Sequence, residues 1–472
     1  MKIDISAIEN YWETEILPTL SEYVSIPCLS VHFEPEWRQT GHIHRAVELV
    51  RAWVERQGLQ GAQIEVIELE GRTPVLLVEI EAFSPTGSPS QTPPVLMYGH
   101  LDKQPPFEGW REGLHPWKAV REGEKLYGRG TGDDGYAVFM ATAIIKHLQQ
   151  QGVAHSRVVM LLETSEESGS PDLEAYVNHL ADRIGTPGLV LALDSGCGDY
   201  ERLWLTTSLR GNLIARLRVQ VMSEGVHSGI SGGAVPNPLR LARQLLERVE
   251  NGATGAIRLP ELNADIPLDR VEQARQAAEV LWAHMAQSYP TLPGVQLEQT
   301  DAEGLLLATT WQPNLAIIGQ KGLPPAETAG NVLLPEVDLK LSFRLPPTVK
   351  APVAAQAVKS ALEANPPQGA KVSVTAGGET GWNAQPLPQW LDTALEEGSQ
   401  LAYGQSFLQT GLGGSIPFMG LLESRFPEAV FVITGVLGPH SNAHGPNEFL
   451  HVDYAKRLTA AMSHVLMAQA KV

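Results

Sequence analysis

Five short segments of the chain gather histidine and carboxylate side chains of the kind that bind metal ions. The segments are Gly99-His100-Leu101-Asp102, Gly132-Asp133-Asp134-Gly135, Glu163-Thr164-Ser165-Glu166-Glu167, Asp194-Ser195-Gly196 and His444-Gly445-Pro446-Asn447-Glu448. Histidine nitrogens and carboxylate oxygens together are what a first-row divalent metal requires. The residue types therefore indicate a metal centre, provided that the fold brings the five segments together.

Each segment by itself has an ordinary structural explanation. Adjacent acids such as Glu166 and Glu167 are common at the start of a helix, where they suit its dipole. Asp194 alone fits a turn or a helix cap. The glycine-rich segment 128–135 could be a phosphate cradle, but it lacks the Lys-Ser/Thr ending of a P-loop, and its two adjacent acids would repel phosphate. It is the ordered set that indicates the metal centre.

Short apolar runs explain how these segments would be positioned. The runs cover residues 94–98, 158–162, 189–193 and 430–433, and candidate ligands follow each of them. Continuous apolar runs are typical of strands covered on both faces, and helical patterns separate the first three. In open α/β sheets, ligands collect outside the carboxyl ends of the strands. The pattern predicts an α/β domain with a mostly parallel sheet.

The middle of the chain has a different pattern. Strands are expected at 213–221 and 337–345, and helices at 239–249 and 353–364. We therefore expect residues 207–376 to form an inserted α+β domain. The α/β domain would comprise residues 1–206 and 377–472.

The ordered segments resemble the M20 metallopeptidases, which include carnosinase-type dipeptidases, glutamate carboxypeptidase and the deacylases of acetylornithine and succinyl-diaminopimelate. The matching segments are Tyr98–Pro105, Leu126–Gly135, Thr164–Ser170, the strand end at Asp194, and His444–Glu448. Within the family the chain resembles the dipeptidases most, because of the segments Gly225–Gly229 and Gly413–Pro417. Two features differ from the family: Gly135 follows the double aspartate directly, where dipeptidases have Lys-Gly, and residues 377–386 lack a histidine that some relatives carry. Both differences bear on the substrate and not on the metals.

The resemblance implies a zinc-peptidase-like domain that binds two divalent ions, with Zn²⁺ favoured and Mn²⁺ or Co²⁺ as alternatives. The implied ligands are Asp133 as the bridge, His100 and Asp194 on one ion, and Glu167 and His444 on the other. Asp102 would orient His100, and Glu166 would be the general base that takes a proton from water. His440 is an alternative to His444, but the trailing Pro-Asn-Glu favours His444.

The resemblance also implies that the insert is a lid and dimerisation domain of a homodimer. His227 would reach the neighbouring subunit's site and stabilise the oxyanion. Asn331 and Arg344 would hold the substrate carbonyl and its C-terminal carboxylate, which suits the planar fork of an arginine. Gly414 and Ser415 would line the carboxylate end. The simpler alternative for Arg344 is a charge on a surface strand.

The implied activity is a metal-dependent dipeptidase or carboxypeptidase that hydrolyses an amide beside a free carboxylate. One alternative is an N-acyl-amino-acid deacylase that uses the same site. Another is a metal-binding protein without catalysis, but Asp133, Glu166 and His227, whose loss would favour it, are all present.

Composition excludes several other classes. The 472 residues include 35 Lys and Arg against 53 Asp and Glu, a net charge of −18. This balance argues against binding to nucleic acid or to an anionic membrane. No apolar stretch is long enough for a transmembrane helix, the start lacks a signal-peptide pattern, and two cysteines provide no disulfide framework. We expect a cytoplasmic enzyme.

Overall fold

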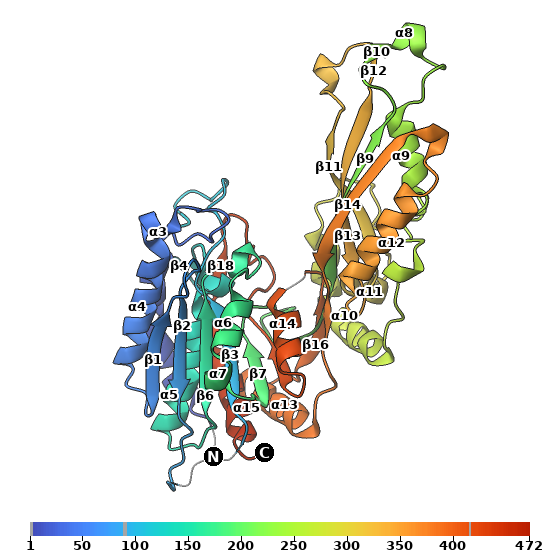
Figure 1. Cartoon of the computed structure of the whole chain (residues 1–472). Helices are drawn as coiled ribbons and strands as arrows, with labels where there is room; N and C mark the ends of the chain where they lie inside the picture. Colours follow the sequence, from blue (N-terminus) through green and yellow to red (C-terminus); the bar gives the residue numbers. More distant parts are fainter. Residues whose placement is uncertain (1–2, 88–91, 415–416) are drawn as a thin grey trace. The chain divides into compact units, whose positions relative to one another are not determined.

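The structure is a computed structural model that describes residues 3–87, 92–414 and 417–472. The chain divides into two compact units (Figure 1). The first comprises Met1–Thr206, Ala384–Thr410 and Pro417–Val472, and the second comprises Thr207–Asn383 and Gly411–Ile416. We expected the insert to end at residue 376. Strand β14 (Lys371–Glu379) runs past that point, and the boundary of the second unit follows it.

A six-stranded sheet forms the centre of the first unit. In spatial order its strands are β1 (Ala62–Ile67), β2 (Val75–Ile80), β6 (Val158–Glu163), β3 (Val95–His100), β7 (Leu189–Ala192) and β17 (Val430–Ile433). The last four run parallel to one another, and β1 and β2 form an antiparallel edge. Every residue of β3, β6 and β7 is buried, as their continuous apolar sequences require. The predicted mostly parallel α/β fold is confirmed.

Helices cover this sheet. They are α1 (Ile5–Tyr11), α2 (Leu17–Val24), α3 (Trp37–Thr40), α4 (His42–Arg56), α5 (Tyr136–Gln150), α6 (Leu173–His179), α7 (Ala181–Ile184), α13 (Gln389–Tyr403), α14 (Pro417–Arg425) and α15 (Val452–Gln469). Almost all of α5 is buried, because it packs between β3 and β6 on one side and α15 on the other. This packing fixes the glycine-rich turn that precedes α5. None of the helices in the described part of the chain is long and apolar enough to cross a membrane.

A small three-stranded sheet brings two distant loops side by side. Its strands are β4 (Val120–Glu122), β5 (Lys125–Tyr127) and β18 (Phe449–His451). Because β5 and β18 pair, the segment that follows Tyr127 lies beside the segment that precedes Phe449, and the amide of Gly128 donates to the carbonyl of Glu448 at 3.0 Å. Two of the candidate ligand segments are joined in this way.

The second unit is built on a four-stranded antiparallel sheet. Its order is β11 (Asn314–Lys321), β13 (Glu336–Leu345), β9 (Gly211–Gln220) and β14. Helices α9 (Pro238–Leu246) and α12 (Ala351–Glu363) cover one face, and alternate residues of β9 and β13 pack under them. These four elements were predicted. The edge strands β11 and β14 were not, because their apolar residues are interrupted by glycine and polar side chains.

Candidate metal centre

The parallel strands bring three of the predicted segments to one edge of the sheet. His100 is the last residue of β3, and Asp194 follows β7 closely. Glu166 and Glu167 begin a short 3₁₀ helix, η3 (Glu166–Ser168), after β6. Because these three strands are adjacent and parallel, their carboxyl ends meet at the same place. The glycine-rich turn before α5 adds Asp133.

The predicted ligands form two clusters that share Asp133. The clusters are His100, Asp133 and Asp194, and Asp133, Glu167 and His444, with ligand atoms within 4.8 Å of one another in each. Oδ1 of Asp133 lies 3.3 Å from Nε2 of His100, and its Oδ2 lies 3.0 Å from Nε2 of His444. The two oxygens of one carboxylate thus face different histidines, which is the arrangement of a ligand that bridges two ions.

The electrostatics of the clusters fit divalent cations. Burial raises the pKa of Asp194 to about 7, and burial together with the Asp194 charge raises the pKa of Glu166 well above its usual value. Although burial opposes it, contact with Asp133 and Glu167 raises the pKa of His444 to about 11. Oε1 of Glu167 is buried and has no hydrogen-bond partner among the described residues. Crowded carboxylates and an unsatisfied buried oxygen are relieved when cations bind.

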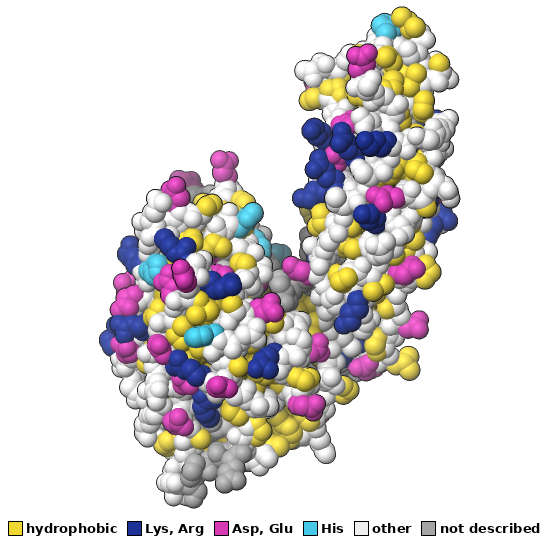
Figure 2. Space-filling view, viewed as in Figure 1, with side chains coloured by type: hydrophobic (Ala, Val, Ile, Leu, Met, Phe, Trp, Pro, Cys, Tyr) yellow, Lys and Arg dark blue, Asp and Glu magenta, His cyan; other side chains and the backbone are white. Residues whose placement is uncertain are grey.

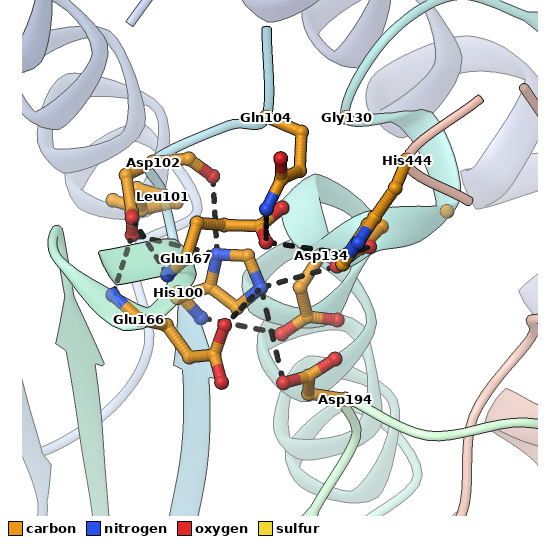
Figure 3. A network of polar contacts seen from close by, with 12 residues as sticks. His100, Leu101, Asp102, Gln104, Gly130, Asp134, Glu166, Glu167, Asp194 and His444 are labelled. Carbon is orange, nitrogen blue, oxygen red and sulfur yellow. Dashed lines mark hydrogen bonds and ion pairs between the residues drawn. The ribbon is translucent and has the colours of Figure 1, made fainter. Parts of the chain in front are cut away.

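The general-base candidate Glu166 lies beside the first cluster. Its Oε2 is 4.0 Å from Nε2 of His100 (Figure 3). The Glu166 side chain is 13% exposed, so water can reach it. Asp102 is fully buried, and its carboxylate accepts hydrogen bonds from the amides of Glu166 and Glu167 at 3.1 and 3.0 Å. Nδ1 of His100 lies 3.1 Å from the backbone carbonyl of Asp102 and 3.5 Å from its carboxylate. Asp102 therefore orients both glutamates as well as the histidine.

Three residues that the sequence analysis did not single out support the ligands. Nε2 of Gln104 donates to Oε2 of Glu167 at 2.7 Å. The carboxylate of Glu448 is fully buried and accepts from Arg129, from the amide of Gly130 at 2.9 Å and from the amide of Asp133 at 3.3 Å. Arg129 also donates to the carbonyl of Gly445 at 2.8 Å. All three lie inside the family motifs, and this position is the signal that could have revealed them.

The loop that carries His444 has unusual backbone angles. His440, Asn442, His444 and Asn447 all have φ between 53° and 65°, a region that residues other than glycine adopt rarely. Such conformations cost energy and persist only where surrounding contacts impose them. Here the Arg129–Gly445 bond and the β5–β18 pairing hold the loop. It is His444, and not His440, that joins the second cluster.

The predicted residues of the insert lie in two places within the second unit. His227 ends β10 (Val226–His227), which pairs with β12 (Val332–Leu333), and the Asn331 carbonyl accepts from the amide of Ser228 at 2.9 Å. These residues lie beyond the Glu336 end of β13. Arg344 lies near the other end of β13, about 27 Å from Glu336 at a rise of ~3.4 Å per residue. Gly414 is exposed, and Ser415 lies outside the described residues.

Residues 96–468 match peptidase family M20/M25/M40. The match spans well over half of the chain, so the chain belongs to this family and is an enzyme of the metallopeptidase type. The resemblance seen in the ordered motifs is confirmed.

Proteins with assigned activities and solved structures agree with this placement. A cysteinylglycine-S-conjugate dipeptidase of Corynebacterium striatum is 28% identical over 467 residues, which cover 97% of this chain and 96% of the relative. A beta-Ala-His dipeptidase of Mus musculus is 27% identical over 372 residues, which cover 75% and 71%. The structure of the dipeptidase Dug1p from Saccharomyces cerevisiae aligns with a TM-score of 0.76 at 21% identity over 100% of both chains.

We predict that Glu448→Gln weakens metal binding by about 10- to 100-fold, a range typical of residues that orient metal ligands. The substitution removes the charge that faces buried Arg129 and the Asp133 amide. Competition with a chromophoric chelator would measure the affinity. Glu122→Gln is the matched control, because Glu122 also pairs with an arginine, Arg111, but both side chains are about half exposed. Equal affinities of the two variants would contradict a positioning role for Glu448.

Proposed function

We propose that this protein is a dipeptidase with two divalent metal ions that hydrolyses the amide bond next to a free C-terminal carboxylate. The observation that carries the proposal is the Asp133 carboxylate, whose two oxygens face His100 and His444. The two relatives described above are named as dipeptidases, which supports this substrate class. A substrate panel of free dipeptides, their C-terminal amides and N-acyl amino acids tests it. Preference for N-acyl amino acids over dipeptides would favour a deacylase instead.

The donor set favours Zn²⁺, with Mn²⁺ or Co²⁺ as substitutes. Two such ions, held by His100 and Asp194, by Glu167 and His444, and by Asp133 between them, would lower the pKa of a water molecule and stabilise negative charge on the scissile carbonyl. Glu166 takes the proton from that water and passes it to the leaving amine. The Glu166 carboxylate lies beside the first cluster, where it can hold the proton between these two steps. Asp102 keeps Glu166 in place through the backbone.

We expect Glu166→Gln to lower kcat by about 10²- to 10⁴-fold or more while both metal ions stay bound, because Glu166 acts on water and is not a ligand. Glu167→Gln should instead lose one ion per chain, since Glu167 belongs to the second cluster. Elemental analysis of the purified variants, beside steady-state kinetics, measures both effects. Loss of metal from Glu166→Gln with retention in Glu167→Gln would mean that the two assignments are reversed.

Arg344 is suited to bind the substrate carboxylate. It is half-buried on β13, between Asn212 of β9 and Asn314 of β11 in the sheet register. Its guanidinium group forms no hydrogen bond or ion pair with the residues that the structure describes. A partly buried arginine without a carboxylate partner is costly unless a ligand supplies one.

We predict that Arg344→Ala lowers kcat/KM on free dipeptides far more than on their C-terminal amides. The lost charge-assisted hydrogen bond is typically worth about 1.5–3 kcal/mol, roughly 10- to 150-fold. Arg344→Lys should restore little, because an ammonium lacks the two-donor fork. Lys371→Ala, an exposed charge on β14, is the control. Equal losses on acid and amide would show that Arg344 is structural.

The separation of His227 and Asn331 from Arg344 supports a homodimer with shared sites. One small substrate cannot contact both ends of β13 in one chain, so we propose that His227 and Asn331 act on the partner subunit's substrate. Nδ1 of exposed His227 accepts from the amide of Gly229 at 3.1 Å. In the neutral ring this leaves the proton on Nε2, from which it can be donated to an oxyanion.

Mixing two inactive variants tests this arrangement. If His227 acts across the dimer, random exchange of His227→Ala with Glu166→Gln makes half of the dimers hybrids, each with one intact site, so activity should recover to about a quarter of wild type. Wild type mixed with the double variant Glu166→Gln/His227→Ala is the control, because its hybrids should have no intact site. Active hybrids in the control, or none in the first mixture once exchange is shown, would place His227 in its own subunit's site.

A further inference from the structure

The charge of the protein is distributed unevenly between its two units. Residues 207–383 contain 15 Lys and Arg against 16 Asp and Glu, a net charge of −1, and residues 411–416 contain no charged side chain. The whole chain carries −18, so the first unit holds −17 of it. The second unit is therefore nearly neutral. One face of its sheet nevertheless carries a group of cations from β9, β11 and β13, namely Arg216, Arg218, Lys321, Lys340 and Arg344.

That face is the side of the four-stranded sheet that α9 and α12 do not cover. The residues of β9 that pack under the helices are Leu213, Ala215, Leu217 and Val219. Arg216 and Arg218 lie between them and point to the opposite side, together with Lys340 of β13 and Lys321 of β11. In Figure 2, dark blue side chains gather on the second unit over the region of β9 and β11.

Two of these cations are placed directly opposite each other. In the register of β9 and β13, Lys340 is the partner of Arg216. Like charges at such positions destabilise a sheet. Asp338 compensates Arg216, whose Nη2 lies 2.6 Å from Oδ2, and Glu336 pairs with Arg218. The side chains of Lys321 and Lys340 form no hydrogen bond or ion pair among the described residues. Asp338 lies opposite Lys321 in the register of β11 and β13, but its carboxylate is already paired with Arg216.

The same face is hollowed where these cations lie. A bulge between Ile317 and Gly319 shifts the register of β11 and sets Gly319, which has no side chain, opposite Lys340. On the far side, a Cβ on Gly377 would meet no atom within 4 Å. The resulting hollow has a volume of about 610 Å³. Its lining combines Arg216, Lys321, Lys340 and Asp338 with Thr375 and the apolar side chain of Ile214.

We propose that this hollow, hereafter the sheet pocket, binds a small molecule with two or more negative charges on carboxylate or phosphate groups. Lysine ammonium groups and arginine suit such groups, and Nη1 of Arg216 is not engaged by Asp338. The volume is that of a small-molecule site. The occupant is small because the hollow holds about 610 Å³, and the net charge of −18 on the chain disfavours an extended polyanion.

Calorimetric titration of the holoenzyme at 0.15 M chloride tests the sheet pocket, with tricarballylate and inorganic phosphate as separate probes. Lys321→Gln/Lys340→Gln removes its two uncompensated charges. Lys350→Gln/Lys359→Gln is the matched control, since both lysines are exposed at or within α12, on the covered side of the sheet, and the charge change is the same. We expect wild type and the control to bind at least one probe, and the pocket variant to bind it at least ~10-fold more weakly.

The probe that binds more tightly identifies the ligand as a polycarboxylate or a phosphate compound. It should also raise the Tm of wild type and of the control, because it relieves the repulsion between Lys340 and Arg216, but not the Tm of the pocket variant. Absence of binding of both probes to wild type would overturn the proposal. So would unchanged affinity in Lys321→Gln/Lys340→Gln, which would place the bound anion elsewhere, for example at the metal centre. The pocket shares no residue with the proposed dipeptidase site, so either proposal can fail alone.

Discussion

The two oxygens of the Asp133 carboxylate face His100 and His444 from a side chain that is only 7% exposed. Asp134, Glu166, Glu167 and Asp194 lie around this carboxylate, so negative charge is concentrated where burial limits its screening by water. Folding alone does not favour such a cluster, because burial disfavours each charge. The surrounding loops have to hold the carboxylates in place, and bound cations have to compensate their negative charge.

The structure holds these loops with buried hydrogen bonds. The Asp102 carboxylate accepts from the amides of the two glutamates after β6, and the Glu448 carboxylate accepts from amides of the turn that carries Asp133. In both cases a carboxylate from one segment receives backbone N–H groups of another. This fixes the position of the backbone itself, so the ligand side chains start from defined points. The left-handed residues around His444 are tolerated because Arg129 and the β5–β18 pairing restrain the loop.

In the second unit the uncompensated charge is positive and lies on a sheet. Helices α9 and α12 cover one face of its sheet, and on the opposite face the described strands carry charged side chains. On that face the side chains of Arg344, Lys340 and Lys321 form no ion pair among the described residues, within a chain that is strongly acidic overall. Unpaired cations on a sheet gain stability when ligands supply negative charge. In both places charge that the protein does not compensate favours a bound ligand of the opposite sign: cations at the metal centre and anions at the sheet face.

The sequence by itself determined the buried central strands and the ligand types. Continuous apolar runs specify buried strands locally, and the motifs that end them place His100, Glu167 and Asp194 at one edge of a parallel sheet. The edge strands β11 and β14 were not predicted, because glycine and polar residues interrupt the alternation of apolar side chains. Their pairing with β13 and β9 holds them in the sheet.

Only the tertiary structure decided which oxygen of Asp133 faces which histidine, and that Glu448, Arg129 and Gln104 hold the ligands. It also decided that Asn331 and Arg344, close in sequence, lie at opposite ends of β13, and that a bulge in β11 hollows the sheet face. These features depend on distances between side chains far apart in the chain. The spacing of apolar residues in the sequence indicates on which face of a strand or helix a residue lies. The distances between remote side chains depend instead on how the strands pair and how the loops pack.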